Sequence, residues 1–197
     1  MAATASPSTA REAPDVRTRI LETASALFYQ RGVRAVGVDL VLQESGAAKA
    51  TLYRHFPTKD DLIVAYLERE EADFWRVWDE VAARHPKSAV AELEAHLQWI
   101  GERLGRGNYR GCPQINVAAE FAENSHPARE VARAHMRALR ERLGGLAKRL
   151  GVARPDALGA QLALLVNGAF ASSELLSPEE ATRVLLAAGR ALVAAAR

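Results

Sequence analysis

The sequence predicts an all-α protein, in which a three-helix helix-turn-helix domain precedes a larger helical domain. Apolar residues recur at helical spacing in nearly every segment, and strand-like alternation of any length is absent. Glycines and prolines separate these segments, at positions where helices typically end or begin. Together, these observations predict about nine helices in the 197 residues.

The first two helices are predicted by apolar faces that end at turn signals. Residues 19–32 (RILETASALFYQRG) place apolar side chains along one helical face, and Gly32 ends the helix. Residues 38–45 predict a second helix of about two turns, which also has one apolar side. A core built from such short helices is marginal, so we expect it to pack on the rest of the chain.

The third segment, residues 46–62 (GAAKATLYRHFPTKDDL), has the features of a DNA-reading helix. Gly46 is suited to the left-handed conformation that turns the chain from one helix into the next. Leu52 and Phe56 lie four residues apart, so they anchor one face of the new helix to a core. From Gly46 to Lys59 the chain has three basic residues and no acid, which suits a phosphate backbone. We therefore predict a helix-turn-helix.

Sixteen positions in this region fall in a single register. They are Ala24, Leu27, Phe28, Gly32, Val38, Asp39, Ser45, Gly46, Lys49, Thr51, Leu52, Tyr53, His55, Phe56, Lys59 and Leu62. In this arrangement, about residues 16–63 resemble the N-terminal domain of TetR-family transcriptional regulators. The resemblance implies an all-helical homodimer, a repressor or activator whose larger domain binds a small effector. One departure is Val36-Gly37, where family members usually carry a Thr or Ser that caps the second helix and touches a phosphate.

The residues expected to contact DNA share the exposed side of the third helix or the start of the next. They are Lys49, Thr51, Tyr53, Arg54, His55 and Lys59. The resemblance assigns Tyr53, His55 and Lys59 to the phosphate backbone, whereas Lys49, Thr51 and Arg54 are able to reach base edges. Two alternatives stay open, namely that Tyr53 is a packing residue and that Lys59 only begins the next helix.

Composition sets limits on the class of protein. The formal net charge of +2 excludes a chain that coats nucleic acid unselectively, so any basic surface is local. A lone cysteine, Cys112, fits a reducing cytoplasm, and neither a membrane-spanning run nor a signal peptide is evident. We expect a disordered arm at residues 1–14, a DNA-binding domain at 15–62, and an effector-binding and dimerisation domain at 63–197.

The second domain is expected to be helical throughout. Its helices are predicted at residues 59–84, 88–104, 112–121, 127–150, 156–176 and 178–196. The first of these links the DNA-binding domain to the rest of the chain. In the family that the chain resembles, the helices between the two ends enclose an effector pocket.

The expected effector site is an apolar pocket with a few polar groups, as small-molecule sites commonly are. Its candidate residues are Trp75, Trp78, Trp99, Cys112, Asn116, Glu120, Phe121 and Met136. For each aromatic residue, plain core packing is the alternative. The effector itself is not predicted by the sequence.

The last two helices are predicted to form a dimer surface. Both have broad apolar faces and small residues, among them Gly168 and Gly189, that allow close helix approach. Two such pairs about a twofold axis would form a four-helix bundle. The proposed interface residues are Leu165, Phe170, Leu185 and Leu192. Packing of both helices within one subunit is the alternative. A dimer would present two reading helices to a palindromic duplex.

Catalytic and metal-binding patterns are weak, and we predict no cofactor, metal or enzymatic activity. Glu120, His126 and His135 have spacings of six and nine residues, which match no fixed pair of helical metal ligands. Two alternatives to a ligand-responsive regulator remain: a redox sensor that uses Cys112 on the same scaffold, and a small helical enzyme.

Overall fold

The computed structural model describes residues 15–172 and 175–197, and these ranges form nine helices with no strand. The helices are α1 (Val16–Arg31), α2 (Val38–Ser45), α3 (Lys49–His55), α4 (Lys59–Ala83), α5 (Ala89–Leu104), α6 (Pro113–Glu120), α7 (Pro127–Arg149), α8 (Pro155–Ala171) and α9 (Pro178–Ala196). The all-α prediction is confirmed. The arm expected at residues 1–14 lies outside the described residues.

Most helix limits agree with the sequence-based expectations within a few residues, and α8 is the exception. It was expected to run to residue 176 but ends at Ala171. Ser172 leaves the helical conformation, and its N–H bonds the Ala169 carbonyl three residues back. Serine side chains compete with the helical backbone for hydrogen bonds, which favours such an end.

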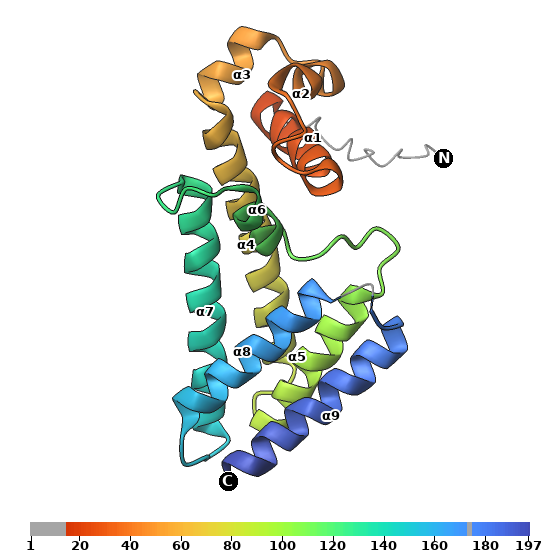
Figure 1. Cartoon of the computed structure of the whole chain (residues 1–197), viewed down its shortest axis with the longest axis vertical. Helices are drawn as coiled ribbons and strands as arrows, with labels where there is room; N and C mark the ends of the chain where they lie inside the picture. The colour runs from red at the N-terminus through yellow and green to blue at the C-terminus, as the bar shows by residue number, and fades with distance from the viewer. Residues whose placement is uncertain (1–14, 173–174) are drawn as a thin grey trace, which may run out of the picture.

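Two hydrophobic cores organise the molecule, which we call the head and the body. The head consists of α1 to α3 and the first turns of α4, and the body of the remaining helices (Figure 1). The head core continues along α4 through Leu67, and Val117 of α6 and Ala128 of α7 also pack into it. A domain boundary near residue 62 stays a prediction, because α4 runs from one core into the other.

Pairs of body helices approach each other closely where a glycine of one helix faces the backbone of the other. A side chain on Gly159 of α8 would lie 2.7 Å from the backbone of Gly144 in α7. A side chain on Gly101 of α5 would lie 2.7 Å from the Cα atom of Thr182 in α9. These contacts hold α7 against α8 and α5 against α9. No helix in the described ranges is both long and apolar enough to cross a membrane.

Candidate nucleic-acid interface and body cavity

The turn between α2 and α3 is held by hydrogen bonds from α2 itself and from α1. Gly46 has φ of 64°, the left-handed conformation, and its N–H bonds the Leu42 carbonyl at 3.0 Å. Arg19 of α1 donates through Nε to the Ser45 carbonyl at 2.9 Å. Leu52 and Phe56 are buried in the head core, as predicted from their spacing. The orientation of α3 is therefore fixed by its inner face.

The outer face of α3 carries the candidate DNA-binding side chains. Lys49 and Arg54 are exposed, and Tyr53 is 39% exposed. Thr51 and His55 are partly buried, and the Nε2 atom of His55 has no hydrogen-bond partner. The structure thus brings these five candidates to a single helix, although the Nε2 atom of His55 is buried there.

A carboxylate that the sequence-based interpretation left out lies beside this face. Asp39 of α2 is 4.0 Å from the Nζ atom of Lys49, and both side chains are mostly exposed. Ion pairs this exposed contribute little to stability. Lys49 is therefore free to exchange Asp39 for another anionic partner.

Lys59 is the first residue of α4, next to α3. Burial lowers the pKa of its ammonium group, and the neighbouring Asp60 partly opposes this effect. A cation at a helix N-terminus is disfavoured by the helix dipole, whereas an anion is favoured there. A phosphate near Lys59 would relieve both costs.

The departure from the family pattern at Val36-Gly37 has a structural consequence. Gly37 is the N-cap of α2 and offers no side-chain hydrogen bond, and Val36 is buried in the head core. No hydroxyl is present at this end of α2 to touch a phosphate.

Comparisons with known proteins agree with this geometry. The family model for bacterial regulatory proteins of the tetR family matches residues 20–66. The crystal structure of SCO4454, a TetR-family transcriptional regulator from Streptomyces coelicolor, superposes with a TM-score of 0.88. That match has 30% sequence identity and covers 93% of this chain and 90% of SCO4454. The chain belongs to the TetR family.

Curated relatives match over shorter stretches of this TetR-family regulator. An uncharacterised HTH-type transcriptional regulator from Mycobacterium tuberculosis is 40% identical over 52 residues, which is 26% of either chain. The HTH-type transcriptional repressor NemR of Escherichia coli is 26% identical over 116 residues, 58% of either chain. The match thus spans about a quarter of the length of the M. tuberculosis relative and somewhat over half of the length of NemR. It is a DNA-binding transcriptional regulator and not an enzyme.

The body of the regulator contains a small cavity of about 10 Å³, room for about one water molecule. Its walls come from α4, α5, α6, α7 and α8. The lining residues are Glu70, Phe74, Arg103, Cys112, Pro113, Gln114, His135 and Phe170. Gln114 is buried, its Nε2 donates to the Leu67 carbonyl at 3.0 Å, and its Oε1 has no partner. An unpaired acceptor in a buried cavity is a position where a ligand donor would bind.

The titratable groups in this cavity favour their neutral forms. Burial raises the pKa of Glu70, although Arg103 partly opposes the shift. Burial lowers the pKa of His135, whose Nδ1 lies 3.8 Å from Glu71 without a hydrogen bond. Apart from the Arg103 guanidinium, the cavity therefore presents weakly charged polar groups beside the rings of Phe74 and Phe170.

The three tryptophans expected at the effector site lie beside the cavity and do not line it. Phe74, which does line it, is the centre of the aromatic cluster: its ring centroid is 4.9 Å from Trp75, 6.1 Å from Trp78 and 5.1 Å from Trp99. Trp78 also stacks on the buried His96 at 3.7 Å. Core packing therefore accounts for the buried rings of Trp78 and Trp99.

Of the remaining effector-site candidates, the structure places only Cys112 in the cavity wall. Asn116 donates to the Arg110 carbonyl at 2.7 Å, and Phe121 stacks on His126 at 3.6 Å. Met136 is partly buried on α7 and does not line the cavity. The sequence analysis missed Glu70 and Gln114, although helical spacing held a signal: Glu70 shares the face of α4 that carries Leu67 and Phe74, and Gln114 lies three residues before the buried Val117.

Glu120 joins the head to the body instead of lining the cavity. Its carboxylate accepts hydrogen bonds from the backbone N–H groups of Val33 at 3.1 Å and Arg34 at 2.8 Å. Both N–H groups belong to the segment between α1 and α2. A pocket role for Glu120 is therefore corrected: its carboxylate is already occupied at the seam between the two parts.

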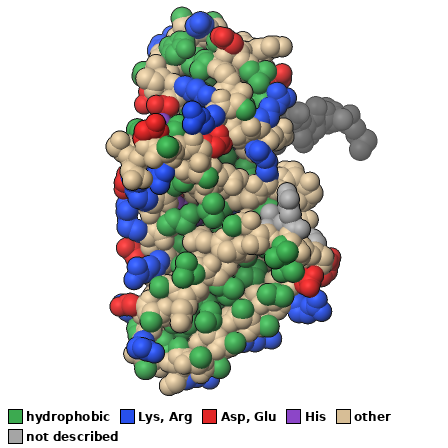
Figure 2. Space-filling view, viewed as in Figure 1, with side chains coloured by type: hydrophobic (Ala, Val, Ile, Leu, Met, Phe, Trp, Pro, Cys, Tyr) green, Lys and Arg blue, Asp and Glu red, His purple; other side chains and the backbone are tan. Residues whose placement is uncertain are grey.

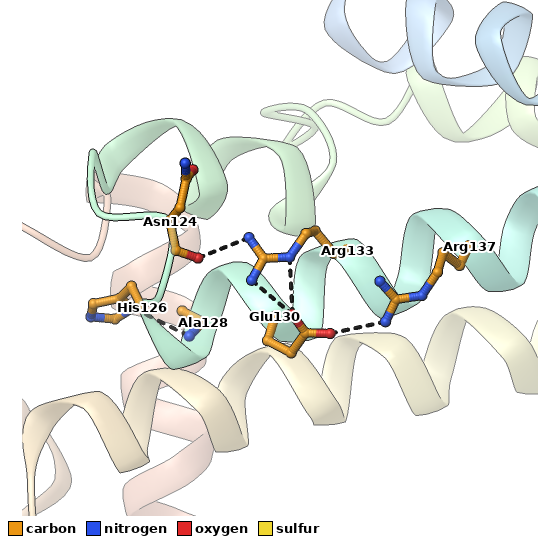
Figure 3. Close-up of polar contacts among 6 residues, drawn as sticks. All are labelled: Asn124, His126, Ala128, Glu130, Arg133 and Arg137. Atoms are coloured by element: carbon orange, nitrogen blue, oxygen red, sulfur yellow. Dashed lines mark hydrogen bonds and ion pairs between the residues drawn. The ribbon is translucent and has the colours of Figure 1, made fainter.

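The start of α7, on the other side of this seam, is held by a charged network (Figure 3). Arg133 donates to the Asn124 carbonyl at 2.9 Å and to the Glu130 carboxylate at 2.7 Å. Arg137 donates to the other oxygen of Glu130, and these two arginines lower the pKa of that carboxyl group. His126 accepts from the Ala128 N–H and lies 3.5 Å from Asp60 of α4.

The metal and redox alternatives gain no geometric support. Glu120, His126 and His135 contact different partners, and no cluster of three metal-ligating side chains occurs among the described residues. Cys112 is buried, and burial raises the pKa of its thiol. A buried thiol with a raised pKa is a poor nucleophile.

The helices α8 and α9 form an outer face whose apolar residues differ in exposure. Leu164 is 74% exposed and Val184 is 45% exposed, whereas Leu165 and Leu192 are partly buried. Hydrophobic side chains gather on this face of the space-filling view (Figure 2). The apolar face is present, with Leu164 and Val184 as its exposed large hydrophobic residues, and its role in dimerisation stays a prediction.

Two proposed interface residues point into the subunit. Phe170 and Leu185 are each only 2% exposed, and Phe170 lies against the body cavity. A side chain on Gly189 would lie 2.3 Å from Leu97 of the same subunit, so this glycine serves the α5–α9 contact. The correction follows from helix geometry: each helix has an inner stripe and an outer stripe, and the sequence does not distinguish them.

Proposed function

We propose that this TetR-family regulator is a homodimeric repressor that leaves a palindromic operator when a small molecule binds in the body cavity. The observation that carries the proposal is the outer face of α3, where exposed donors surround a helix anchored by Leu52 and Phe56. Tyr53, His55 and Lys59 would position the head on phosphates. Lys49, Thr51 and Arg54 would read bases.

Dimerisation is supported by the exposed apolar residues of α8 and α9. Burial of Leu164 and Val184 against a second copy would form a four-helix bundle, with residues 63–197 providing the interface. The two copies of α3 would then lie about 34 Å apart, one helical turn of DNA. Repression is supported by the name of NemR, a transcriptional repressor. A DNA target supports a cytoplasmic location.

The effector role rests on the body cavity and on α4. Because the cavity has room for only about one water molecule, an effector must enlarge it, and Phe74 and Glu70 of α4 line its wall. A shift of α4 would move the head that it carries. Effector and DNA would then oppose each other through one equilibrium, with reciprocal coupling.

Selection of bound duplexes from a random pool tests the proposal. We expect a palindromic consensus with two half-sites and affinity that falls steeply with salt. Gln114→Leu is the matched variant for the effector: it should keep operator binding but lose release by any compound that releases the wild type. Sequence-independent binding alone would contradict the operator, and release of the variant by the same compound would contradict the cavity.

A further inference from the structure

A second cavity of about 230 Å³ lies at the seam between the head and the body. Ser25 and Tyr29 of α1 form one wall, and Arg103 of α5 with Arg106 and Tyr109 of the following loop form another. Glu70 and Arg103 also line the body cavity, so the two spaces are adjacent. Figure 1 shows this loop leaving the end of α5 towards α6. We call this space the seam cavity.

Two hydroxyl groups of the seam cavity lack hydrogen-bond partners. Ser25 is only 8% exposed, and its Oγ atom is buried and unpaired. The Oη atom of Tyr109 is also buried and unpaired. They come from opposite parts of the protein, α1 of the head and the loop of the body. Since buried polar groups in native proteins are nearly always satisfied, these two hydroxyls indicate a missing partner between them.

The charges around the seam cavity favour an anionic partner. Neither the Arg103 nor the Arg106 guanidinium makes a hydrogen bond or ion pair with any residue in the described ranges. Glu70 supplies a carboxyl group, and burial raises its pKa, which weakens its negative charge. Guanidinium groups bind carboxylate and phosphate oxygens through two parallel donors. The two guanidinium groups therefore carry more positive charge than the single carboxyl group of this cavity can balance.

We propose that the seam cavity binds a small oxyanion, a molecule with a carboxylate or phosphate group, between α1 of the head and the end of α5. Arg103 and Arg106 hold the charged group, and the hydroxyls of Ser25 and Tyr109 donate to its remaining oxygens. Because this ligand contacts both head and body, its binding is coupled to the position of the head. The site shares Glu70 and Arg103 with the body cavity, but Ser25, Arg106 and Tyr109 belong to the seam cavity alone, and oxyanion binding does not depend on the proposed function.

Calorimetric titration of the full chain without DNA tests this site. The probes are sodium succinate and inorganic phosphate, with the ionic strength held constant by sodium chloride; these two arms distinguish a carboxylate from a phosphate source. We expect saturable binding of at least one probe at roughly millimolar concentration. Arg106→Ala should weaken binding roughly tenfold, the loss of a charge-assisted hydrogen bond. Tyr109→Phe should weaken it by less.

Two further variants make the result specific. Glu70→Gln should tighten oxyanion binding, because it removes the one carboxylate of the cavity. Arg84→Ala removes an exposed arginine before the opposite end of α5 and should leave binding unchanged. The circular dichroism of each variant checks that it is folded, and Arg106→Lys replaces Arg106→Ala if the latter is not.

Several results would overturn the seam site. These are no saturable heat with either probe, an equal loss in Arg84→Ala, or weaker binding in Glu70→Gln, which would indicate a cationic ligand. Because the titration contains no DNA, failure here leaves the operator test unaffected. Failure of operator selection likewise leaves this measurement intact.

Discussion

The carboxylate of Glu120 provides a direct test of how the head is fixed to the body. It accepts two backbone hydrogen bonds, from Val33 at 3.1 Å and Arg34 at 2.8 Å, across a gap of more than 80 residues in the sequence. Glu120→Ala removes both bonds. Glu120→Gln keeps one acceptor oxygen, so it should lower the free energy of unfolding by about half as much as Glu120→Ala.

The expected magnitude follows from the number of bonds and their exposure. Hydrogen bonds to charged groups contribute about 1.5–3 kcal/mol each when well buried. These two are partly buried or exposed, so we take the lower end, about 2–3 kcal/mol for Glu120→Ala and about half of that for Glu120→Gln. The Arg34 side chain still donates to the Glu120 carbonyl in both variants, which limits the loss.

Urea unfolding, followed by circular dichroism, measures the free energy of unfolding of each variant. Hydrogen exchange provides a second measurement, because the amides of Val33 and Arg34 should exchange faster when their acceptor is gone. Glu123→Ala is the matched control, since this carboxylate is exposed and lies three residues away on the same segment. If Glu120→Ala differed from this control by less than about 0.5 kcal/mol, with unchanged exchange at Val33 and Arg34, the coupling assigned to Glu120 would be refuted.

Four further predictions concern DNA binding, assembly and pH. Lys59→Ala should weaken binding equally on operator and random DNA and flatten the salt slope by about one unit; an unchanged slope would remove the phosphate contact. Arg54→Ala should relax base preference at one position per half-site, and an unaltered selected consensus would argue against base reading. Leu164→Arg should give folded monomers in sedimentation experiments, whereas Phe170→Glu should unfold the subunit itself; a Leu164→Arg dimer at micromolar concentration would contradict the α8–α9 interface. Burial lowers the pKa of His96 to about 4 from its usual value of 6.5, so protonation favours the unfolded chain and stability should fall between pH 6.5 and about 4. His96→Phe should flatten that part of the urea-stability profile, and identical profiles would disprove the assignment.

The sequence by itself determined the helices and the outward side of α3, which is the candidate DNA-binding face. Helical periodicity and turn residues are local properties, so they predicted eight of the nine described helices to within a few residues. The buried pair Leu52 and Phe56 and the exposed Lys49 and Arg54 followed from the same local argument. In a helix as short as α3, the spacing of two apolar anchors already defines which side faces outward.

Only the tertiary structure decided which polar and apolar residues meet. Gln114 and Glu70 share helix faces with apolar residues, but only the packing of five helices shows that they line one cavity, whereas Glu120 bonds the backbone of the head instead. Phe170 and Leu185 lie inside one subunit because α8 and α9 are apolar on more than one side. Periodicity specifies that a helix has a buried face, but which neighbour covers that face depends on long-range packing that no local pattern contains.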